Sequence, residues 1–289
     1  MRLGGELETV CAEAGLRQTG HVRMLGTEDK WAAVEIAIST DDANINQTRA
    51  KLRSVFSGRA DVALLPTRNR KKRLLISDMD STIIQQECLD ELAAYAGLKD
   101  EIAAITTRAM AGELNFESAL TERVGKLKGL SLTALEQCYA ERITLMPGAR
   151  TLTATMTANK AYCLLVSGGF TFFTSRVAET VGFHDHRGNT LMDDGTSLTG
   201  EVGLPILGRE AKLEAMDDTA FANGLNRLDA LAMGDGANDL AMIEAAGLGL
   251  AVHAKSIVSD AADAAIDVTD LTAALYFQGY TDSEIIWRE

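Results

Sequence analysis

The stretch Leu74-Leu75-Ile76-Ser77-Asp78-Met79-Asp80-Ser81-Thr82 decides the fold of this chain. It begins with aliphatic residues and no charge, which is typical of a strand buried on both faces of a parallel sheet. It ends in two carboxylates followed by two hydroxyls. Because ligands of open α/β sheets gather beyond the carboxyl ends of the strands, we expect Asp78 and Asp80 to lie where a ligand binds. Taken alone, the motif is equally compatible with a plain polar turn, since Asp, Ser and Thr are common turn residues.

Length and composition indicate an ordinary globular protein. The chain has 289 residues, of which 46% are hydrophobic and 24% charged, enough for one large α/β domain and a smaller one. The net charge of −13 argues against a nucleic-acid partner, because nucleic acids favour basic surfaces. An anionic substrate is still compatible with this charge, since a metal ion and a few cations reverse its sign locally.

The cysteines and the first residues indicate in which cellular compartment the protein is expected. Cys11, Cys88, Cys138 and Cys163 are scattered without metal-ligand spacing, which favours free thiols in a reducing cytosol. The sequence after Met1 has no apolar leader segment, and no apolar run is long enough to cross a bilayer. We therefore expect a cytoplasmic protein without a membrane partner.

Residues 1–70 are predicted to form a separate small α+β domain. Helical spacing occurs in 9–14 and 45–56, strand-like alternation in 32–38, and another strand-like run in 63–66. This domain carries no motif with chemistry. The basic run Arg68-Asn69-Arg70-Lys71-Lys72-Arg73 resembles a nucleic-acid patch, but a solvated linker is the favoured interpretation in so acidic a chain.

The remaining residues, 71–289, are predicted to form a doubly wound, Rossmann-like parallel sheet with an inserted helical cap at about 86–143. The cap segment contains no proline and no strand-like run. Buried strands are expected to alternate with helices, and a hairpin is expected around Asp194-Gly195. His184-Asp185-His186 is interpreted as a polar loop rather than a metal site. The strands are expected at 161–166, 228–233, 248–252 and 265–268.

Three of these strands end in polar turns, at Asp78 to Thr82, Ser167 to Gly169 and Gly234 to Asp239, and Lys212 precedes the third. In this order the motifs resemble the four signatures of the haloacid dehalogenase superfamily over residues 74–270. The resemblance implies that Asp78 is a nucleophile forming an aspartyl-phosphate and that Asp80 is the general acid and base. Lys212 is implied to stabilise the charge of the transferring phosphoryl group.

The same resemblance implies a Mg²⁺ cofactor and a phosphate site. The expected ligands are the Asp78 carboxylate, the Asp80 backbone carbonyl and Asp235, with Asp239 supporting them. The turn of Ser167, Gly168 and Gly169 is implied to bind phosphate oxygens, and Asn238 to reach the substrate. Without the resemblance, the glycines would be an ordinary loop, and Asn238 and Asp239 would be helix caps.

The cap motifs narrow the substrate. Residues 78–82 followed by Glu87, residues 109–117 followed by Arg123, and residues 166–170 all resemble the phosphoserine phosphatases of this superfamily. That resemblance implies Mg²⁺-dependent hydrolysis of O-phospho-L-serine to L-serine and phosphate, the last step of serine biosynthesis. Glu87 would meet the ammonium and Arg123 the carboxylate, while Phe116 would wall the site. The plainer alternatives are that Glu87 favours a helix N-terminus and that Arg123 pairs with a nearby acid such as Glu122.

Three other functions remain open at this point. The first is action on another small amino-bearing phosphate, such as phosphothreonine or phosphohomoserine. The second is a binding or regulatory protein on an inactive scaffold, with the N-terminal domain sensing an amino acid. The third, a cation-pump fragment, is disfavoured because pumps carry Lys after the nucleophile, where this chain has Met79. In related phosphatases such an N-terminal extension often resembles a regulatory or dimerising domain, so a homodimer is also an expectation.

Overall fold

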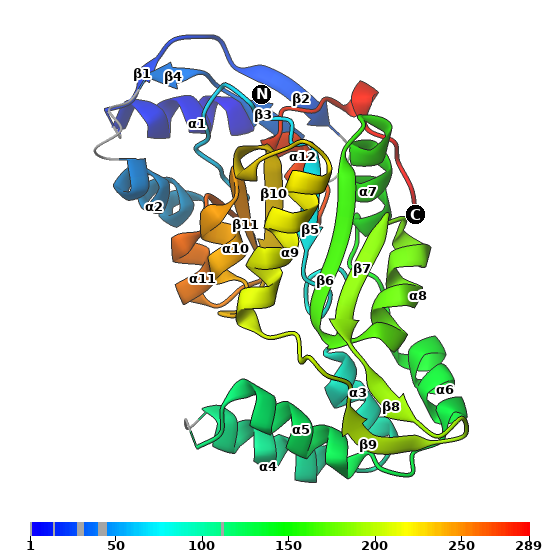
Figure 1. The fold of residues 1–289 in the computed structure, drawn as a ribbon. Helices are drawn as coiled ribbons and strands as arrows, with labels where there is room; N and C mark the ends of the chain where they lie inside the picture. Colours follow the sequence, from blue (N-terminus) through cyan, green and yellow to red (C-terminus); the bar gives the residue numbers. More distant parts are fainter. Residues whose placement is uncertain (1, 14, 28–31, 40–44, 111–112) are drawn as a thin grey trace.

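The computed structural model describes residues 2–13, 15–27, 32–39, 45–110 and 113–289 (Figure 1). Its centre is a six-stranded sheet in the order β12-β11-β10-β5-β6-β7, with all neighbouring strands parallel. This arrangement confirms the predicted doubly wound α/β fold. The strands are β5 (Leu74–Ser77), β6 (Tyr162–Phe170), β7 (Asp185–Asn189), β10 (Ala230–Gly234), β11 (Leu248–Val252) and β12 (Ala264–Ile266).

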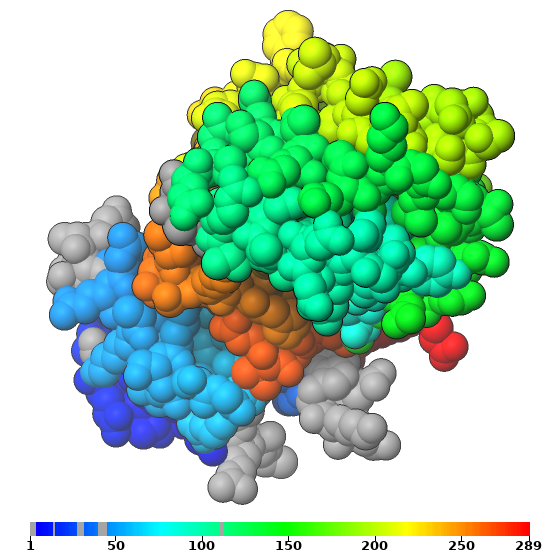
Figure 2. Space-filling model, turned by 90° about the horizontal axis from the view of Figure 1, so that it is seen from below, coloured from blue at the N-terminus to red at the C-terminus, as the bar shows by residue number. Residues whose placement is uncertain are grey.

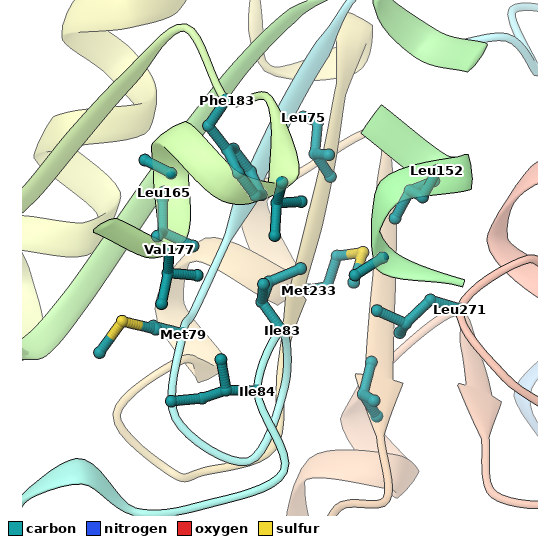
Figure 3. Packing of buried hydrophobic residues seen from close by; sticks show 14 of the residues in the cluster. Leu75, Met79, Ile83, Ile84, Leu152, Leu165, Val177, Phe183, Met233 and Leu271 are labelled. Carbon is teal, nitrogen blue, oxygen red and sulfur yellow. The ribbon is translucent and has the colours of Figure 1, made fainter. Parts of the chain in front are cut away.

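The central strand β5 is buried along its whole length, as its apolar sequence predicts. Because successive side chains point to opposite faces of a strand, Leu75 joins one hydrophobic cluster while Leu74 and Ile76 join another. Figure 3 shows the first cluster, in which Leu165 from the sheet lies beside Val177 from a covering helix. The sheet is therefore covered on both faces, which a parallel sheet requires.

Helices form these two covers (Figure 1). One face carries α7 (Ala149–Ala158) and α8 (Thr171–Val181), and the other carries α9 (Arg209–Ala222), α10 (Leu240–Ala245) and α11 (Ser256–Ala261). The chain closes with α12 (Ala273–Phe277) and the 3₁₀ turn η3 (Asp282–Glu284); a further 3₁₀ turn, η2 (Arg227–Asp229), precedes β10. Among the described residues, no helix is long and apolar enough to cross a membrane.

Four helices and a hairpin lie beyond the carboxyl end of β5 (Figure 1). The helices are α3 (Cys88–Tyr95), α4 (Lys99–Met110), α5 (Phe116–Lys126) and α6 (Leu132–Arg142). Asn115 and Ser131 cap α5 and α6, since each side chain accepts a hydrogen bond from a first-turn backbone N–H. Residues 111–112 of the quoted cap motif lie outside the described residues.

The expected hairpin is confirmed as β8 (Leu191–Asp193) paired antiparallel with β9 (Leu198–Val202). It packs on the cap helices, since Gly129 N–H donates to Leu198 O and Leu132 N–H donates to Thr196 O. A two-stranded hairpin from a segment far along the chain thus packs against the helical insertion. Figure 2, seen from the cap side, shows the green cap residues in front of the core. The cap limits of 86–143 remain a prediction.

The N-terminal residues form their own mixed unit. It comprises α1 (Arg2–Glu13), α2 (Ile45–Phe56), the antiparallel pair β1 (Arg17–Gln18) with β4 (Ile38–Ser39), and the antiparallel pair β2 (Arg23–Thr27) with β3 (Ala32–Glu35). Val10, Leu52 and Phe56 form a small core of their own. The expected strand at 63–66 is wrong, because this extended run pairs with no strand. Residue 14 of the expected helix 9–14 lies outside the described residues, and the domain boundary at residue 70 remains a prediction.

Polar contacts join this unit to the core. The Asp61 carboxylate accepts hydrogen bonds from the backbone N–H groups of residues 267–269, and Arg53 donates to the carbonyls of Ser259 and Ala262. The basic run is not a fully solvated linker: Lys72 is buried, and its ammonium donates to the carbonyls of Asn69 and Leu228. Figure 2 shows the blue N-terminal residues beside the orange part of the core.

The interpretation of His184-Asp185-His186 as a polar loop is wrong for its last two residues. They begin β7, which pairs with β6 at the edge of the sheet. His184 Nδ1 accepts a hydrogen bond from Cys163 N–H at 3.0 Å, and His186 Nδ1 lies 2.9 Å from the Thr174 hydroxyl. Both histidines thus serve sheet and helix packing.

Candidate active site

The site begins where β5 ends. The Asp78 N–H donates to Met233 O on β10, which continues the parallel pairing up to the first carboxylate. The N–H groups of Ile83 and Ile84 both donate to Met79 O, so the chain turns sharply after the strand. Because β6 lies on one side of β5 and β10 on the other, the chain changes direction across the sheet here, where doubly wound proteins bind ligands.

Asp78 is paired with a buried lysine. Lys212 Nζ lies 2.7 Å from Asp78 Oδ2 and 2.6 Å from Asp239 Oδ1, and the Lys212 side chain is 2% exposed. Burial alone lowers the pKa of Lys212, but the charges of Asp78 and Asp239 outweigh it and hold the pKa above its ordinary value. Lys212 is therefore a cation at neutral pH, fixed beside the expected nucleophile.

Asp80 has a different environment. Its Oδ1 accepts a hydrogen bond from the Cys88 N–H at 3.3 Å, at the start of α3. Burial, together with the negative charge of Glu87, raises the pKa of Asp80 to about 8. The two carboxylates, although only two residues apart, thus differ in their tendency to hold a proton, because within the described residues Asp78 has a cation beside it and Asp80 does not.

The turn after β6 approaches Asp80. Ser167 is buried, and its Oγ accepts a hydrogen bond from Gly169 N–H at 2.8 Å. A Cβ placed on Gly169 would lie 3.0 Å from both Asp80 Oδ2 and Ser167 Oγ. A Cβ on Gly168 would meet the Phe116 ring at 3.4 Å. These glycines therefore let the backbone lie against the second carboxylate on one side and the cap on the other.

The turn after β10 completes an acidic cluster. Asp78, Asp235 and Asp239 each place a carboxylate oxygen within 4.8 Å of the others. Asp239 heads α10 but makes no capping bond; instead its oxygens bind Lys212 and the Gly236 N–H. Asn238 is exposed and folds back over Gly236.

This cluster fits a hard divalent cation. Its donors are all carboxylate oxygens, which Mg²⁺ prefers. Burial and the negative charge of Asp78 raise the pKa of Asp235 to about 6, and no salt bridge within the described ranges reaches Asp235. A cation held between Asp78 and Asp235 would offset this repulsion. Asp239 is already engaged with Lys212, so it is suited to support rather than to ligate.

The cap brings its expected residues to the same place. The Glu87 carboxylate is held by the Ser81 hydroxyl at 2.7 Å rather than serving as a helix cap. Arg123 is half-buried. Burial lowers its pKa, while the negative charges of Asp90 and Glu87 act in the opposite direction. It does not pair with Glu122, which Arg108 holds instead at 2.7 Å.

Two contributions escaped the sequence reasoning. One is the Cys88 N–H, a backbone donor whose partner cannot be predicted from the residue types. The other is Ser81, whose hydroxyl holds Glu87. A hydroxyl residue in the same turn as the two acids was visible, but its partner depends on the backbone conformation of the turn.

Taken together, the geometry offers a buried carboxylate beside a cation, a second carboxylate suited to carry a proton, and oxygen donors for a divalent metal. A covalent phosphoryl transfer needs these three parts. Comparison with known proteins agrees: the model of the haloacid dehalogenase-like hydrolases matches residues 75–244. The chain belongs to this family.

Several curated relatives carry a more specific name. The phosphoserine phosphatase of Archaeoglobus fulgidus is 38% identical over 242 residues, covering 83% of this chain and 70% of the relative. That of Streptomyces coelicolor is 39% identical over 255 residues, and this chain spans 62% of its length. The resemblance to phosphoserine phosphatases seen in the motifs is thereby confirmed.

Solved structures give the same result. A haloacid dehalogenase family hydrolase of Salmonella enterica serovar Typhi matches with a TM-score of 0.80 at 27% identity, covering 94% of this chain and 92% of that one. A substrate-bound phosphoserine phosphatase matches with a TM-score of 0.66 at 37% identity, over 72% of this chain and 98% of that one. Because the first match covers 94% of this chain, it includes most of the N-terminal unit, whereas the second leaves more than a quarter of the chain unmatched.

Proposed function

We propose that this protein hydrolyses O-phospho-L-serine to L-serine and phosphate in a Mg²⁺-dependent reaction through an aspartyl-phosphate. The observation that carries the proposal is the buried Asp78–Lys212 pair at the switch point of the sheet, with Asp80 beside it. The relatives named phosphoserine phosphatase support the choice of substrate.

The reaction would proceed in two displacements. In the first, an Asp78 oxygen attacks phosphorus and the serine oxygen leaves, taking the proton of Asp80. In the second, Asp80 takes a proton from water, whose oxygen attacks the same phosphorus and releases Asp78 and phosphate. Lys212 is charged when the reaction begins, because Asp78 and Asp239 hold its pKa above the ordinary value, and Asp239 remains beside it once Asp78 carries the phosphoryl group. It offsets the negative charge that gathers around phosphorus.

Asp78, Asp235 and the Asp80 carbonyl would hold Mg²⁺, with Asp239 and Lys212 fixing Asp78. When bound, the ion neutralises phosphate charge that would otherwise repel the attacking carboxylate. The buried Ser167 hydroxyl and the adjoining glycine amides are suited to bind phosphate oxygens, and Asn238 adds an amide from the next turn.

The cap would select the substrate. Glu87 offers a carboxylate to the ammonium of phosphoserine, and Arg123 offers a planar guanidinium to its carboxylate. Phe116 packs against Gly168 and so covers the phosphate turn from the cap side. A substrate without the amino-acid group would lose both ionic contacts but keep the chemistry at phosphorus.

The test is phosphate release from L-phosphoserine with Mg²⁺ and then with excess chelator, for the wild type and Asp78→Asn. We expect release that needs Mg²⁺ and disappears in the variant. Asp217→Asn is a matched control, because that carboxylate pairs with Arg227 on the surface. Cleavage of an aryl phosphate without cleavage of phosphoserine would refute the substrate assignment, and a panel with phosphothreonine and phosphohomoserine would name the alternative.

We also propose a cellular location, a role for residues 1–70 and an oligomeric state. The protein is expected in the cytoplasm, on its composition and scattered free cysteines. Residues 1–70 are expected to act as a regulatory or dimerising domain, with a homodimer as the assembly. Size measurement by light scattering of the wild type and of a chain beginning near residue 70 would test the last point.

A further inference from the structure

We propose that Ser81 is a positioning residue, which fixes the Glu87 carboxylate for recognition of the substrate ammonium. This inference rests on the proposed function and deepens it, since it assigns part of the substrate selectivity to a residue outside the acidic cluster of Asp78, Asp235 and Asp239.

The first argument is the backbone of Ser81. Its φ is +52°, in the left-handed region that residues with a Cβ rarely adopt. Glycine adopts this conformation without steric strain. The Ser81 N–H donates to Gln86 O at 3.1 Å, so this conformation is held in place by the turn. A non-glycine residue kept at such a position points to a use for its side chain.

The second argument is what that side chain does. The Ser81 hydroxyl donates to Glu87 Oε1 at 2.7 Å. Among the hydrogen bonds of the described residues, this is the only one that reaches the Glu87 carboxylate. Glu87 precedes α3, but its side chain makes no capping bond to that helix. Without Ser81, a long and solvent-accessible side chain would sample many rotamers, and ordering it would cost binding free energy.

The third argument is the place of this bond in the site. The turn between the two residues is closed at its other end by the Cys88 N–H, which donates to Asp80. One loop therefore fixes both the proton-transferring carboxylate and the recognition carboxylate. Burial lowers the pKa of Arg123 and the negative charge of Glu87 acts to raise it, so the two groups that would meet the amino-acid part of the substrate act on each other within the cap.

The experiment compares Ser81→Gly with the wild type on three phosphates: L-phosphoserine, the analogue that lacks the amino group, and an aryl phosphate. Glycine suits the backbone of residue 81, so the variant is expected to keep its fold. We expect KM for phosphoserine to rise about tenfold, the scale of a hydrogen bond to a charged group. KM for the analogue without an ammonium, and kcat on all three, should stay unchanged.

Two controls separate positioning from general damage. In a Glu87→Ala background, Ser81→Gly should add no further rise in KM, because no hydrogen-bonding side chain is left at residue 87 for the Ser81 hydroxyl to position. Ser131→Ala, which removes a capping hydroxyl from α6 in the same cap, should leave the ratio of the KM values unchanged.

The outcomes are distinct. A wild type that does not cleave phosphoserine overturns the proposed function. An active wild type overturns the Ser81 assignment alone if Ser81→Gly leaves KM for phosphoserine unchanged. Equal rises in KM for all three phosphates, or additive effects in the double variant, also overturn it.

Discussion

Lys212 Nζ lies 2.7 Å from Asp78 Oδ2, and the two side chains are 2% and 7% exposed. A lysine this deeply buried needs compensating charge, which Asp78 and Asp239 supply together. These two ion pairs hold Asp78, the proposed nucleophile, in the acidic cluster, so we expect both stability and chemistry to depend on Lys212.

We predict that Lys212→Met lowers kcat on phosphoserine by about 10² to 10³, the usual loss for a group that stabilises transition-state charge. It should also destabilise the fold by about 3–5 kcal/mol, because two buried carboxylates lose their cation. Added Mg²⁺ should restore part of this stability but not the activity. Thermal melts and steady-state kinetics with and without Mg²⁺ provide the measurements.

Lys72→Met is the matched control. Lys72 is also buried, but its ammonium donates to two backbone carbonyls far from the acidic cluster. We expect it to lose stability while keeping kcat. If both variants keep normal turnover, the role of Lys212 in catalysis is wrong.

Asp80→Asn is predicted to lower kcat on phosphoserine by about 10² to 10⁴, the usual contribution of a positioned acid and base. Asparagine keeps the shape of the protonated acid but cannot transfer a proton. An aryl phosphate with a good leaving group needs little protonation, so its first displacement should survive. Rapid-mixing kinetics should show one equivalent of phenol released in a burst, followed by slow turnover. Normal turnover of phosphoserine would exclude Asp80 as the acid and base.

Gly169→Ala should impair the enzyme more than Gly168→Ala. A Cβ on Gly169 would lie 3.0 Å from Asp80 Oδ2 and Ser167 Oγ, so one of these groups must shift. A misplacement of about 1 Å costs about 100-fold in rate, so a shift of a few tenths of an ångström is expected to cost about tenfold. A Cβ on Gly168 meets only the end of the Phe116 ring at 3.4 Å, an ordinary contact. Comparing kcat/KM of the two variants checks the order, and equal losses would contradict it.

The elements that could be predicted from the sequence share one property. Their burial or their chemistry requires particular residue types, which the sequence shows directly. β10 and β11 are apolar throughout, and β5 is apolar up to Ser77, because these strands are buried on both faces. β7 escaped prediction because an edge strand with the sequence Asp185 to Asn189 has no apolar pattern. The buried Lys72 was likewise hidden within a run of exposed cations.

The site follows the same rule. Asp78 and Asp80 could be predicted because they follow the buried strand β5, and the family resemblance singled out both acids together with Lys212 on α9. The link between Ser81 and Glu87 could not, since it depends on a left-handed backbone that no residue type announces. The contact between Gly168 and Phe116 depends on how the cap lies against the core, which local sequence does not contain.

Docking of the N-terminal unit should depend on pH through Glu35. Its carboxylate binds Arg23 and Arg70 at 2.5 and 2.6 Å, and Arg70 also donates to Phe277 O near the chain's end. Burial opposes ionisation, but the bonds from Arg70 and Arg23 outweigh it and lower the pKa of Glu35. A lowered pKa gives stability that is present above the unfolded value of about 4.3 and is lost as pH falls through the folded value. Glu35→Gln should therefore cost up to about 1 kcal/mol at neutral pH. In urea unfolding this difference should shrink at acid pH, whereas a constant difference at both pH values would show that Glu35 acts through packing instead.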